Sequence, residues 1–308
     1  LSIFTFGNYW LMATYCSLVS FWGMWVSANA LLQIFPKTSL ALFSSFFVFP
    51  SIVFWTSGLL KESISIGIIH ALLAFCLTIL TQKKVKYWHF LLTPVFLWVL
   101  WRLKYYYFAL SVFCLFAFSM SFLINQAYKL SIFKQTLLWF GIAFSLLFFA
   151  PFIHSNLSFN YILWALTQSN QIMTSQSSVR NISHYINLQD NFWSFILNAP
   201  LAMASAFFRP FLSEGGNIFK VLLGVENLIV LVLFSKLIFK KHSKKLIKAN
   251  FLLLLTAFVY ISLSGILLAF AAPNFGALAR YKMVFFPFFI YILFSQLKKC
   301  TFFKFLYY

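Results

Sequence analysis

Charge is scarce in this sequence. Only 9% of its 308 residues are charged, and Asp and Glu together number 4 against 23 Lys and Arg. Soluble domains average roughly 25% charged residues, whereas 62% of this chain is hydrophobic. These proportions exclude an ordinary soluble domain and indicate an all-α, polytopic membrane protein. The net charge of +19 does not require nucleic acid as a partner, because lysines that flank membrane spans on one side account for it.

Cysteine is also scarce. The 4 cysteines lie in or next to apolar runs without CxxC spacing, so we predict neither a disulfide framework nor a metal site. The DxD, HExxH, GxSxG, Walker and GxGxxG patterns are absent from any suitable context, which leaves hydrolase, metalloprotease and NTPase functions without support. We therefore expect a function that needs no metal and no cofactor.

Long apolar runs dominate what is present. A spanning helix needs about 20 apolar residues, which leaves room for about nine spans in one membrane-embedded helical domain, residues 1–308. We predict spans at residues 9–35, 38–56, 62–81, 87–102, 105–124, 136–153, 218–239, 249–271 and 281–297. The chain begins with Leu1 and no basic segment precedes the first run, so we expect a fragment that lacks its N-terminus.

Alternating these spans places the N-terminus outside and the C-terminus in the cytoplasm. Cytoplasmic segments are expected to be rich in Lys and Arg. Fifteen of the 23 basic residues then fall on the cytoplasmic side: Lys37, Lys83, Lys84, Lys86, Lys129, Lys134, Lys236, Lys240, Lys241, Lys244, Lys245, Lys248, Lys298, Lys299 and Lys304. Omitting the short fourth span would reverse this distribution, so we retain it.

The longest polar region is predicted to be an extracytoplasmic loop over residues 154–217. Its middle, residues 167–191, is crowded with Ser, Asn and Gln. Loops of this length in compact proteins are usually functional or disordered. Residues 192–211 are apolar but interrupted by Pro200, Arg209 and Pro210, so we predict an interfacial or re-entrant helix there.

The predicted topology separates the charged residue types. All four Arg and the acids Glu62, Asp190 and Glu214 fall on the extracytoplasmic side, while the cytoplasmic side carries Lys alone. Arg binds phosphate in a bidentate manner that Lys cannot reproduce. This asymmetry favours a site for a phosphate-bearing ligand at the outer membrane boundary. The alternative is that these are scattered interfacial charges.

Several outer basic residues sit beside aromatic or turn residues. Arg102 and Lys104 precede three Tyr, and Arg280 and Lys282 enter the last span. Each is either a binding residue or an interfacial anchor that snorkels to the membrane surface. Arg209 and Glu214 are spaced for a local ion pair or a substrate clamp. Glu226, inside the seventh span, is expected to face the bundle interior.

The segment between Pro50 and Glu62 separates two long apolar runs. Pro50 is expected to bend or stop a helix, and Gly58 permits a turn. Lys61 and Glu62 are the first charges after Lys37. They are either part of a chemical site at the mouth of a span, or Glu62 complements the dipole of a helix that Thr56 or Ser57 caps.

Four stretches carry a resemblance. They are Pro50-Ser-Ile-Val-Phe-Trp-Thr-Ser-Gly-Leu-Leu-Lys-Glu, Leu103-Lys-Tyr-Tyr-Tyr, Phe208-Arg-Pro-Phe-Leu-Ser-Glu with Glu226-Asn227, and Asn274-Phe-Gly-Ala-Leu-Ala-Arg-Tyr-Lys. On these, the chain resembles bacterial membrane glycosyltransferases of the GT-C type and O-antigen or exopolysaccharide polymerases. The resemblance implies a bacterial inner-membrane enzyme that uses a polyprenyl-diphosphate-linked sugar at the extracytoplasmic face. The GT-C pattern places a catalytic acid in the first outer loop, and here no acid precedes Glu62.

The resemblance also implies roles for individual residues. The diphosphate would be bound by basic residues, for which the candidates are Lys61, Arg102, Lys104, Arg209, Arg280 and Lys282. The catalytic base would be a carboxylate, for which the candidates are Glu62, Asp190 and Glu214, or a loop histidine such as His154 or His184. Two alternatives remain: a transporter or flippase for lipid-linked glycans, and a non-catalytic subunit of a membrane complex.

Overall fold

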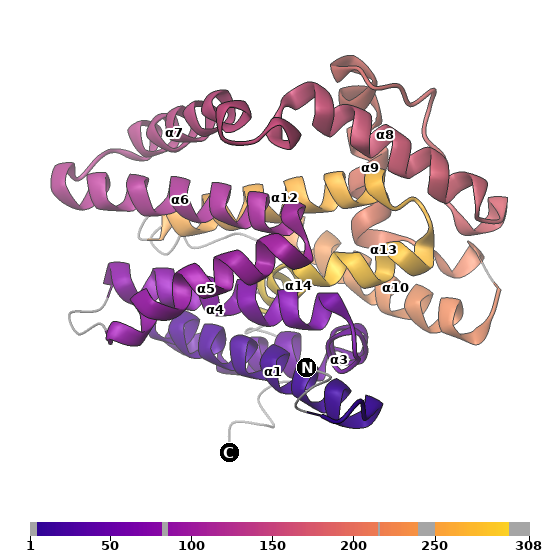
Figure 1. Ribbon diagram of the computed structural model, residues 1–308, viewed down its shortest axis with the longest axis horizontal. Coiled ribbons are helices and arrows are strands. Elements are labelled where there is room, and N and C mark those ends of the chain that lie inside the picture. The colour runs from indigo at the N-terminus through magenta and orange to yellow at the C-terminus, as the bar shows by residue number, and fades with distance from the viewer. Residues whose placement is uncertain (1–4, 82–85, 215, 240–249, 296–308) are drawn as a thin grey trace. The chain divides into compact units, whose positions relative to one another are not determined.

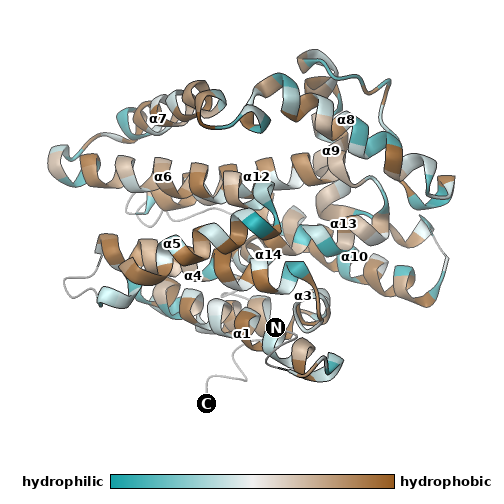
Figure 2. Ribbon diagram, in the orientation of Figure 1, coloured by the Kyte–Doolittle hydropathy of each residue, from teal (hydrophilic) through white to brown (hydrophobic). Residues whose placement is uncertain are grey.

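The computed structural model describes residues 5–81, 86–214, 216–239 and 250–295, and these are built from helices (Figure 1). No strand occurs within those ranges; an isolated bridge pairs Ile182 with Asn274. The predicted all-α class is therefore confirmed. Figure 2 shows hydrophobic residues along most of the helices, as a membrane-embedded chain requires.

Six helices of the described residues are long and apolar enough to cross a membrane. They are α1 (Tyr9–Ile34), α4 (Lys61–Thr81), α6 (Tyr105–Tyr128), α7 (Ile132–Ile153), α10 (Ile218–Phe239) and α12 (Phe251–Ala271). Two bent pairs, Pro36–Val48 with Pro50–Thr56 and Phe275–Val284 with Phe286–Ser295, raise the number to eight if each pair forms one span. The chain is thus a multi-pass membrane protein with six to eight candidate spans. The predicted number of about nine also counts α5 (Tyr87–Leu103), which has 17 residues.

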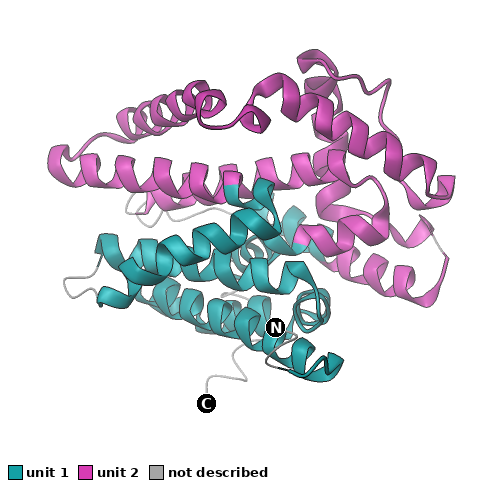
Figure 3. Ribbon diagram, viewed as in Figure 1, with its two compact units in different colours: residues 1–108, 230–241, 283–308 teal, residues 109–229, 242–282 magenta. Residues whose placement is uncertain are grey.

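The described residues divide into two compact units, which Figure 3 colours separately. Unit 1 comprises residues 1–108, 230–241 and 283–308, and unit 2 comprises residues 109–229 and 242–282. Lys61, Glu62, Arg102 and Lys104 therefore belong to unit 1. The remaining candidate residues, from Asp190 to Lys282, belong to unit 2.

In unit 1, α1 and α4 lie in parallel and in close contact. A Cβ atom added to Gly23 would collide with the carbonyl group of Gly67, and the Ser20 hydroxyl donates a hydrogen bond to the Ser63 carbonyl at 2.6 Å. Glycine allows helix backbones to approach this closely, as in other membrane helix pairs.

The α5 helix runs antiparallel to α4. The ring of Phe75, late in α4, lies 4.7 Å from the ring of His89 at the start of α5. Lys104, which follows the last residue of α5, pairs with Glu62 in the first turn of α4. Helix α5 therefore returns along α4, and its membership of the spans stays a prediction.

The predicted break at Pro50 is present. Helix α3 (Pro50–Thr56) begins at this proline and is bent by 51° from the helical segment Pro36–Val48. Neither Thr56 nor Ser57 caps the next helix, because α4 begins only at Lys61 and the two hydroxyls donate back to the Ile52 and Phe54 carbonyls of α3. Glu62 does lie in the first turn of α4, where a carboxylate complements the helix dipole.

In unit 2 the region predicted as a long loop is folded onto α12. It contains α8 (Phe159–Ser175) and α9 (Phe192–Phe208), and both pack on α12. The last carbonyl groups of α12 accept hydrogen bonds from the region: Ala269 from the Tyr185 hydroxyl, Phe270 from the Asn170 amide and Ala271 from the Ser169 hydroxyl. These bonds satisfy backbone groups that a helix end leaves unpaired.

Helix α9 lies where an interfacial or re-entrant helix was predicted. Ala202 and Ala206 are buried on one face, while Trp193, Leu197 and Leu201 are exposed on another. An exposed apolar face suits contact with lipid. Its interfacial or re-entrant position stays a prediction.

One hydrogen bond shows that α7 and α12 begin at the same end of unit 2. The indole nitrogen of Trp139, near the start of α7, donates to the Thr256 hydroxyl near the start of α12. The turn between α6 and α7, with Lys129 and Lys134, is therefore at the end opposite the folded region 154–217. The predicted alternation places these two ends on opposite sides of the membrane. Of the other predicted cytoplasmic lysines, the following lie outside the described residues: Lys83, Lys84, Lys240, Lys241, Lys244, Lys245, Lys248, Lys298, Lys299 and Lys304.

Candidate functional site

Two of the predicted site residues in unit 1 bind each other. The Lys104 ammonium lies 3.0 Å from the Glu62 carboxylate, with side chains 13% and 4% exposed. The same ammonium donates to the Tyr106 hydroxyl at 2.8 Å and lies 5.7 Å from the centre of the Tyr107 ring. The Lys104 ammonium compensates the charge of the Glu62 carboxylate and occupies it, which disfavours Glu62 as a free catalytic base.

Lys104 stays charged in this setting. Burial lowers the pKa of its ammonium, but contacts with Tyr106 and Glu62 raise it, and the net shift is upward. Lys61 and Arg102 are exposed on the surface of unit 1.

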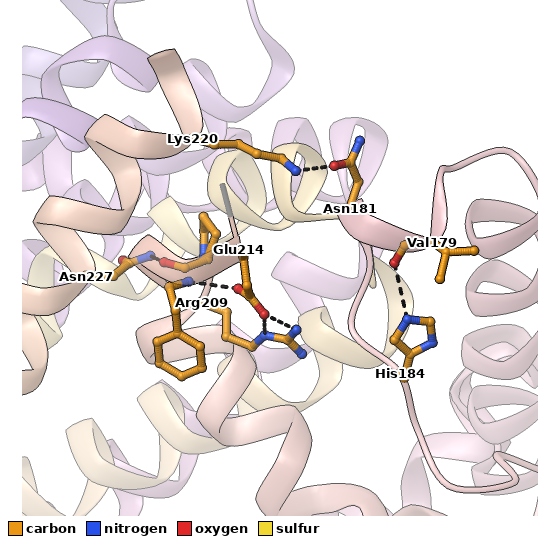
Figure 4. Close-up of polar contacts among 9 residues, drawn as sticks. Val179, Asn181, His184, Arg209, Glu214, Lys220 and Asn227 are labelled. Atoms are coloured by element: carbon orange, nitrogen blue, oxygen red, sulfur yellow. Dashed lines mark hydrogen bonds and ion pairs between the residues drawn. The ribbon is translucent and has the colours of Figure 1, made fainter. Parts of the chain in front are cut away.

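Unit 2 brings together Arg209 and Glu214, as their spacing predicted (Figure 4). The Arg209 Nε donates to Glu214 Oε1 at 2.7 Å, and one terminal nitrogen of the guanidinium also contacts that oxygen. The other carboxylate oxygen accepts a hydrogen bond from the Phe211 backbone at 2.8 Å. The pair is partly exposed, with side chains 23% and 18% accessible.

A second cation approaches the same aromatic ring as Arg209. The Arg209 guanidinium lies 4.7 Å from the centre of the Phe275 ring, and the Lys220 ammonium lies 5.7 Å from it. Lys220 also contacts the Asn181 side-chain carbonyl (Figure 4). Phe275 is the first residue of α13 (Phe275–Tyr281), which packs next to the end of α12. Cations near an aromatic face are stabilised by its quadrupole, so Phe275 helps to hold two positive charges at one place.

Asn227 connects this cluster to Lys282. Its amide donates to the Pro210 carbonyl at 3.1 Å, and its side-chain oxygen accepts from the Lys282 ammonium at 3.0 Å. Glu226, which was expected to face the bundle interior, lies within electrostatic range of Lys282. Lys282 is only 1% exposed, so in this conformation it supports the cluster from within.

Arg280 lies on α13, in the turn of helix after Phe275. Its guanidinium donates to the Tyr281 hydroxyl at 3.1 Å and lies 4.9 Å from the centre of that ring. We call Arg209, Glu214, Lys220, Phe275, Arg280 and Lys282 the α13 cluster. The other predicted acid of this unit, Asp190, is exposed just before α9.

The loop histidines make local contacts. The His154 ring accepts a hydrogen bond from the Asn156 backbone at 3.1 Å, and the His184 ring lies 3.2 Å from the Val179 carbonyl (Figure 4). Both are exposed. These local contacts favour roles in loop structure over catalysis.

No sequence pattern marked Lys220, Phe275 or Tyr185 as site residues. Phe275 was within the motif that begins at Asn274, which was a usable signal. Tyr185 lies within electrostatic reach of Arg209, and burial raises its phenol pKa while Arg209 lowers it, with a net upward shift. Nothing in the local sequence signals the proximity of Tyr185 to Arg209, because it results from the folding of region 154–217 onto α12.

No group of three or more His, Cys, Asp or Glu side chains in the described part of the chain could hold a metal ion. No family model, curated protein or solved structure matches this chain.

Proposed function

We propose that this chain is a bacterial inner-membrane glycosyltransferase or polysaccharide polymerase that uses polyprenyl-diphosphate-linked sugars at the extracytoplasmic face. The observation that carries the proposal is the α13 cluster. Four cations contribute to it. Arg209 and Lys220 lie over the Phe275 ring, Asn227 connects Lys282 to the Pro210 carbonyl, and Arg280 lies on the same short helix as Phe275, at the end of α12 that is predicted to be extracytoplasmic. Two of the four, Arg209 and Arg280, are arginines, the residue type suited to bidentate contact with phosphate oxygens.

The substrate would lie with its polyprenyl tail in the bilayer and its diphosphate at this cluster. The bond between C1 of the sugar and the diphosphate oxygen breaks, and a hydroxyl group of the acceptor glycan forms the new bond to C1. Arg209, Lys220 and Arg280 stabilise the negative charge that develops on the departing diphosphate. Fixed charges aimed at developing charge usually contribute more to catalysis than any other single effect.

The proton of the acceptor hydroxyl needs a base. Of the three predicted carboxylates, Glu214 belongs to the α13 cluster and forms an ion pair with Arg209. When the Arg209 guanidinium binds the diphosphate in place of Glu214, the Glu214 carboxylate becomes free to accept the proton of the acceptor hydroxyl. Glu62 is held by Lys104 in unit 1, and Asp190 remains a further candidate.

The test is transfer of a radiolabelled sugar by the purified protein in liposomes that contain a polyprenyl-diphosphate sugar. We expect Arg280→Ala to abolish product and Arg209→Ala to lower its rate by about a hundredfold, the usual effect of removing one stabilising donor. Arg180→Ala is the matched control, because Arg180 is exposed in the same region of unit 2.

Unchanged yield and chain length in both cluster variants would contradict the proposal. Movement of the intact lipid-linked sugar across the bilayer without any transfer would indicate a flippase instead.

A further inference from the structure

A groove runs between α6 and α7 in unit 2, and one of its ends is at Lys134, opposite the folded region 154–217. Its volume is about 680 Å³. Its walls are almost wholly apolar, and they include Met120, Ile124, Leu138, Gly141 and Phe149. A Cβ atom added to Gly141 would meet no other atom within 4 Å, so the middle of the groove is open.

One end of the groove carries positive charge. Lys134 lies in the first turn of α7, lines the groove and is exposed. Lys129 is exposed in the short connection that precedes α7. Both lysines are at the end of unit 2 that is predicted to be cytoplasmic.

The length of the groove suits one lipid chain. Residues 134–149 of α7 extend over about 22 Å at 1.5 Å per residue. Half of a hydrocarbon core of about 30 Å is about 15 Å. A chain anchored at Lys134 therefore remains within the groove over the whole depth of its own leaflet.

We propose that this groove binds one anionic phospholipid, with an acyl chain between α6 and α7 and its phosphate at Lys134. In a bilayer the acyl chain gains little from leaving other lipid tails, since these are as apolar as the groove. Selectivity must therefore come from the head group. Basic pockets between membrane helices on the cytoplasmic side are suited to anionic head groups.

The same charge disfavours a second copy of the chain as the occupant. In a membrane, two copies related by a two-fold axis along the membrane normal present the same end to each other. Lys129 and Lys134 of one copy would then face those of the other. Like charges at such an interface are repulsive.

The test is native mass spectrometry of the purified protein titrated with phosphatidylglycerol or phosphatidylcholine. We expect one tightly retained phosphatidylglycerol and no comparable retention of phosphatidylcholine. Lys134→Ala should weaken phosphatidylglycerol binding about fivefold, which corresponds to the contribution of one Lys at an anionic membrane surface. Lys37→Ala, which removes an exposed lysine of unit 1, is the charge control and should have no effect.

Gly141→Leu tests the groove independently of charge. The added side chain enters open space and leucine favours a helix more than glycine does, so the variant should fold and lose the bound lipid. Equal retention of the two lipids, or unchanged binding by both Lys134→Ala and Gly141→Leu, would overturn the proposal. A dimer that dissociates in Gly141→Leu would also overturn it, since the occupant would then be a second copy.

Discussion

Helices α1 and α4 of unit 1 touch backbone to backbone, whereas α6 and α7 of unit 2 leave a groove between them. At Gly23 and Gly67 an added methyl group would collide with the partner helix, while at Gly141 it would meet nothing within 4 Å. Both units have glycine in a membrane helix, but the packing around the glycine differs. In unit 1 glycine closes the packing, and in unit 2 it leaves room.

The ion pairs of the two units also differ in burial, and the pair in unit 1 is again the more closely packed. The Glu62 side chain in unit 1 is 4% exposed and that of Lys104 is 13% exposed, against 18% for Glu214 and 23% for Arg209 in unit 2. A buried pair has a structural role, because separating its charges leaves each one buried and uncompensated. A partly exposed pair can exchange partners with a ligand. From this comparison we expect the Glu62–Lys104 pair to have a structural role and the Arg209–Glu214 pair to be the one that can contact a ligand.

The largest effect should come from breaking the unit 1 ion pair. Glu62→Ala leaves the Lys104 ammonium in a mostly buried place and should destabilise the protein by about 3 kcal/mol. Chemical unfolding in detergent measures this change. Lys61→Ala, at the exposed neighbouring position, should stay within about 0.5 kcal/mol of the parent.

A double variant, Glu62→Leu with Lys104→Met, removes both charges and should recover much of the loss. If Glu62→Ala were as stable as the parent protein, the assignment of a structural role to this pair would be wrong.

The next effect should come from the helix contact in unit 1. Gly23→Ala forces α1 away from α4, because the colliding atoms belong to the backbone. We expect a loss of about 2 kcal/mol, within the usual range for overpacking. The same unfolding measurement applies, and a neutral result would show that the two helices do not pack this closely.

A smaller effect is expected at the unit 2 ion pair. Glu214→Gln keeps an oxygen that can accept from the Phe211 backbone but removes the charge facing Arg209. Because the pair is partly exposed, the loss should be about 1 kcal/mol or less. A loss as large as that of Glu62→Ala would remove the distinction between the two pairs.

The smallest effect should be that of Gly141→Ala. The methyl group enters the open groove, and alanine is the better helix former by up to about 1 kcal/mol. Stability should be unchanged or slightly raised. Read beside Gly23→Ala, this variant compares the same substitution in closed and open packing, and a marked loss would mean that the groove is filled by protein.

Composition and apolar run length determined the helices of the membrane region. The run predicted at residues 218–239 matches α10 (Ile218–Phe239), and the run at 9–35 matches α1 (Tyr9–Ile34) within one residue. A spanning helix satisfies its own backbone hydrogen bonds and needs only local hydrophobicity, so the sequence suffices to place it. The break at Pro50 was predictable for the same reason, because proline acts on its own helix.

Other elements depended on distant contacts. Helix α8 lies in a stretch rich in Ser, Asn and Gln, and its Ser169 and Asn170 side chains bind carbonyl groups of α12 about a hundred residues later in the chain. The bent pair at Phe275–Val284 and Phe286–Ser295 begins earlier than the predicted span at 281–297 and turns by 70°. Local pattern does not specify either feature.

The sequence by itself determined that this is a helical membrane protein and which few charged residues it places near the predicted extracytoplasmic face. Only the tertiary structure decided that Glu62 is paired with Lys104, that Lys282 is buried against Asn227, and that Arg209 and Lys220 approach Phe275. Hydrophobicity is a property of each segment, whereas the partner of a charge depends on which segments fold together.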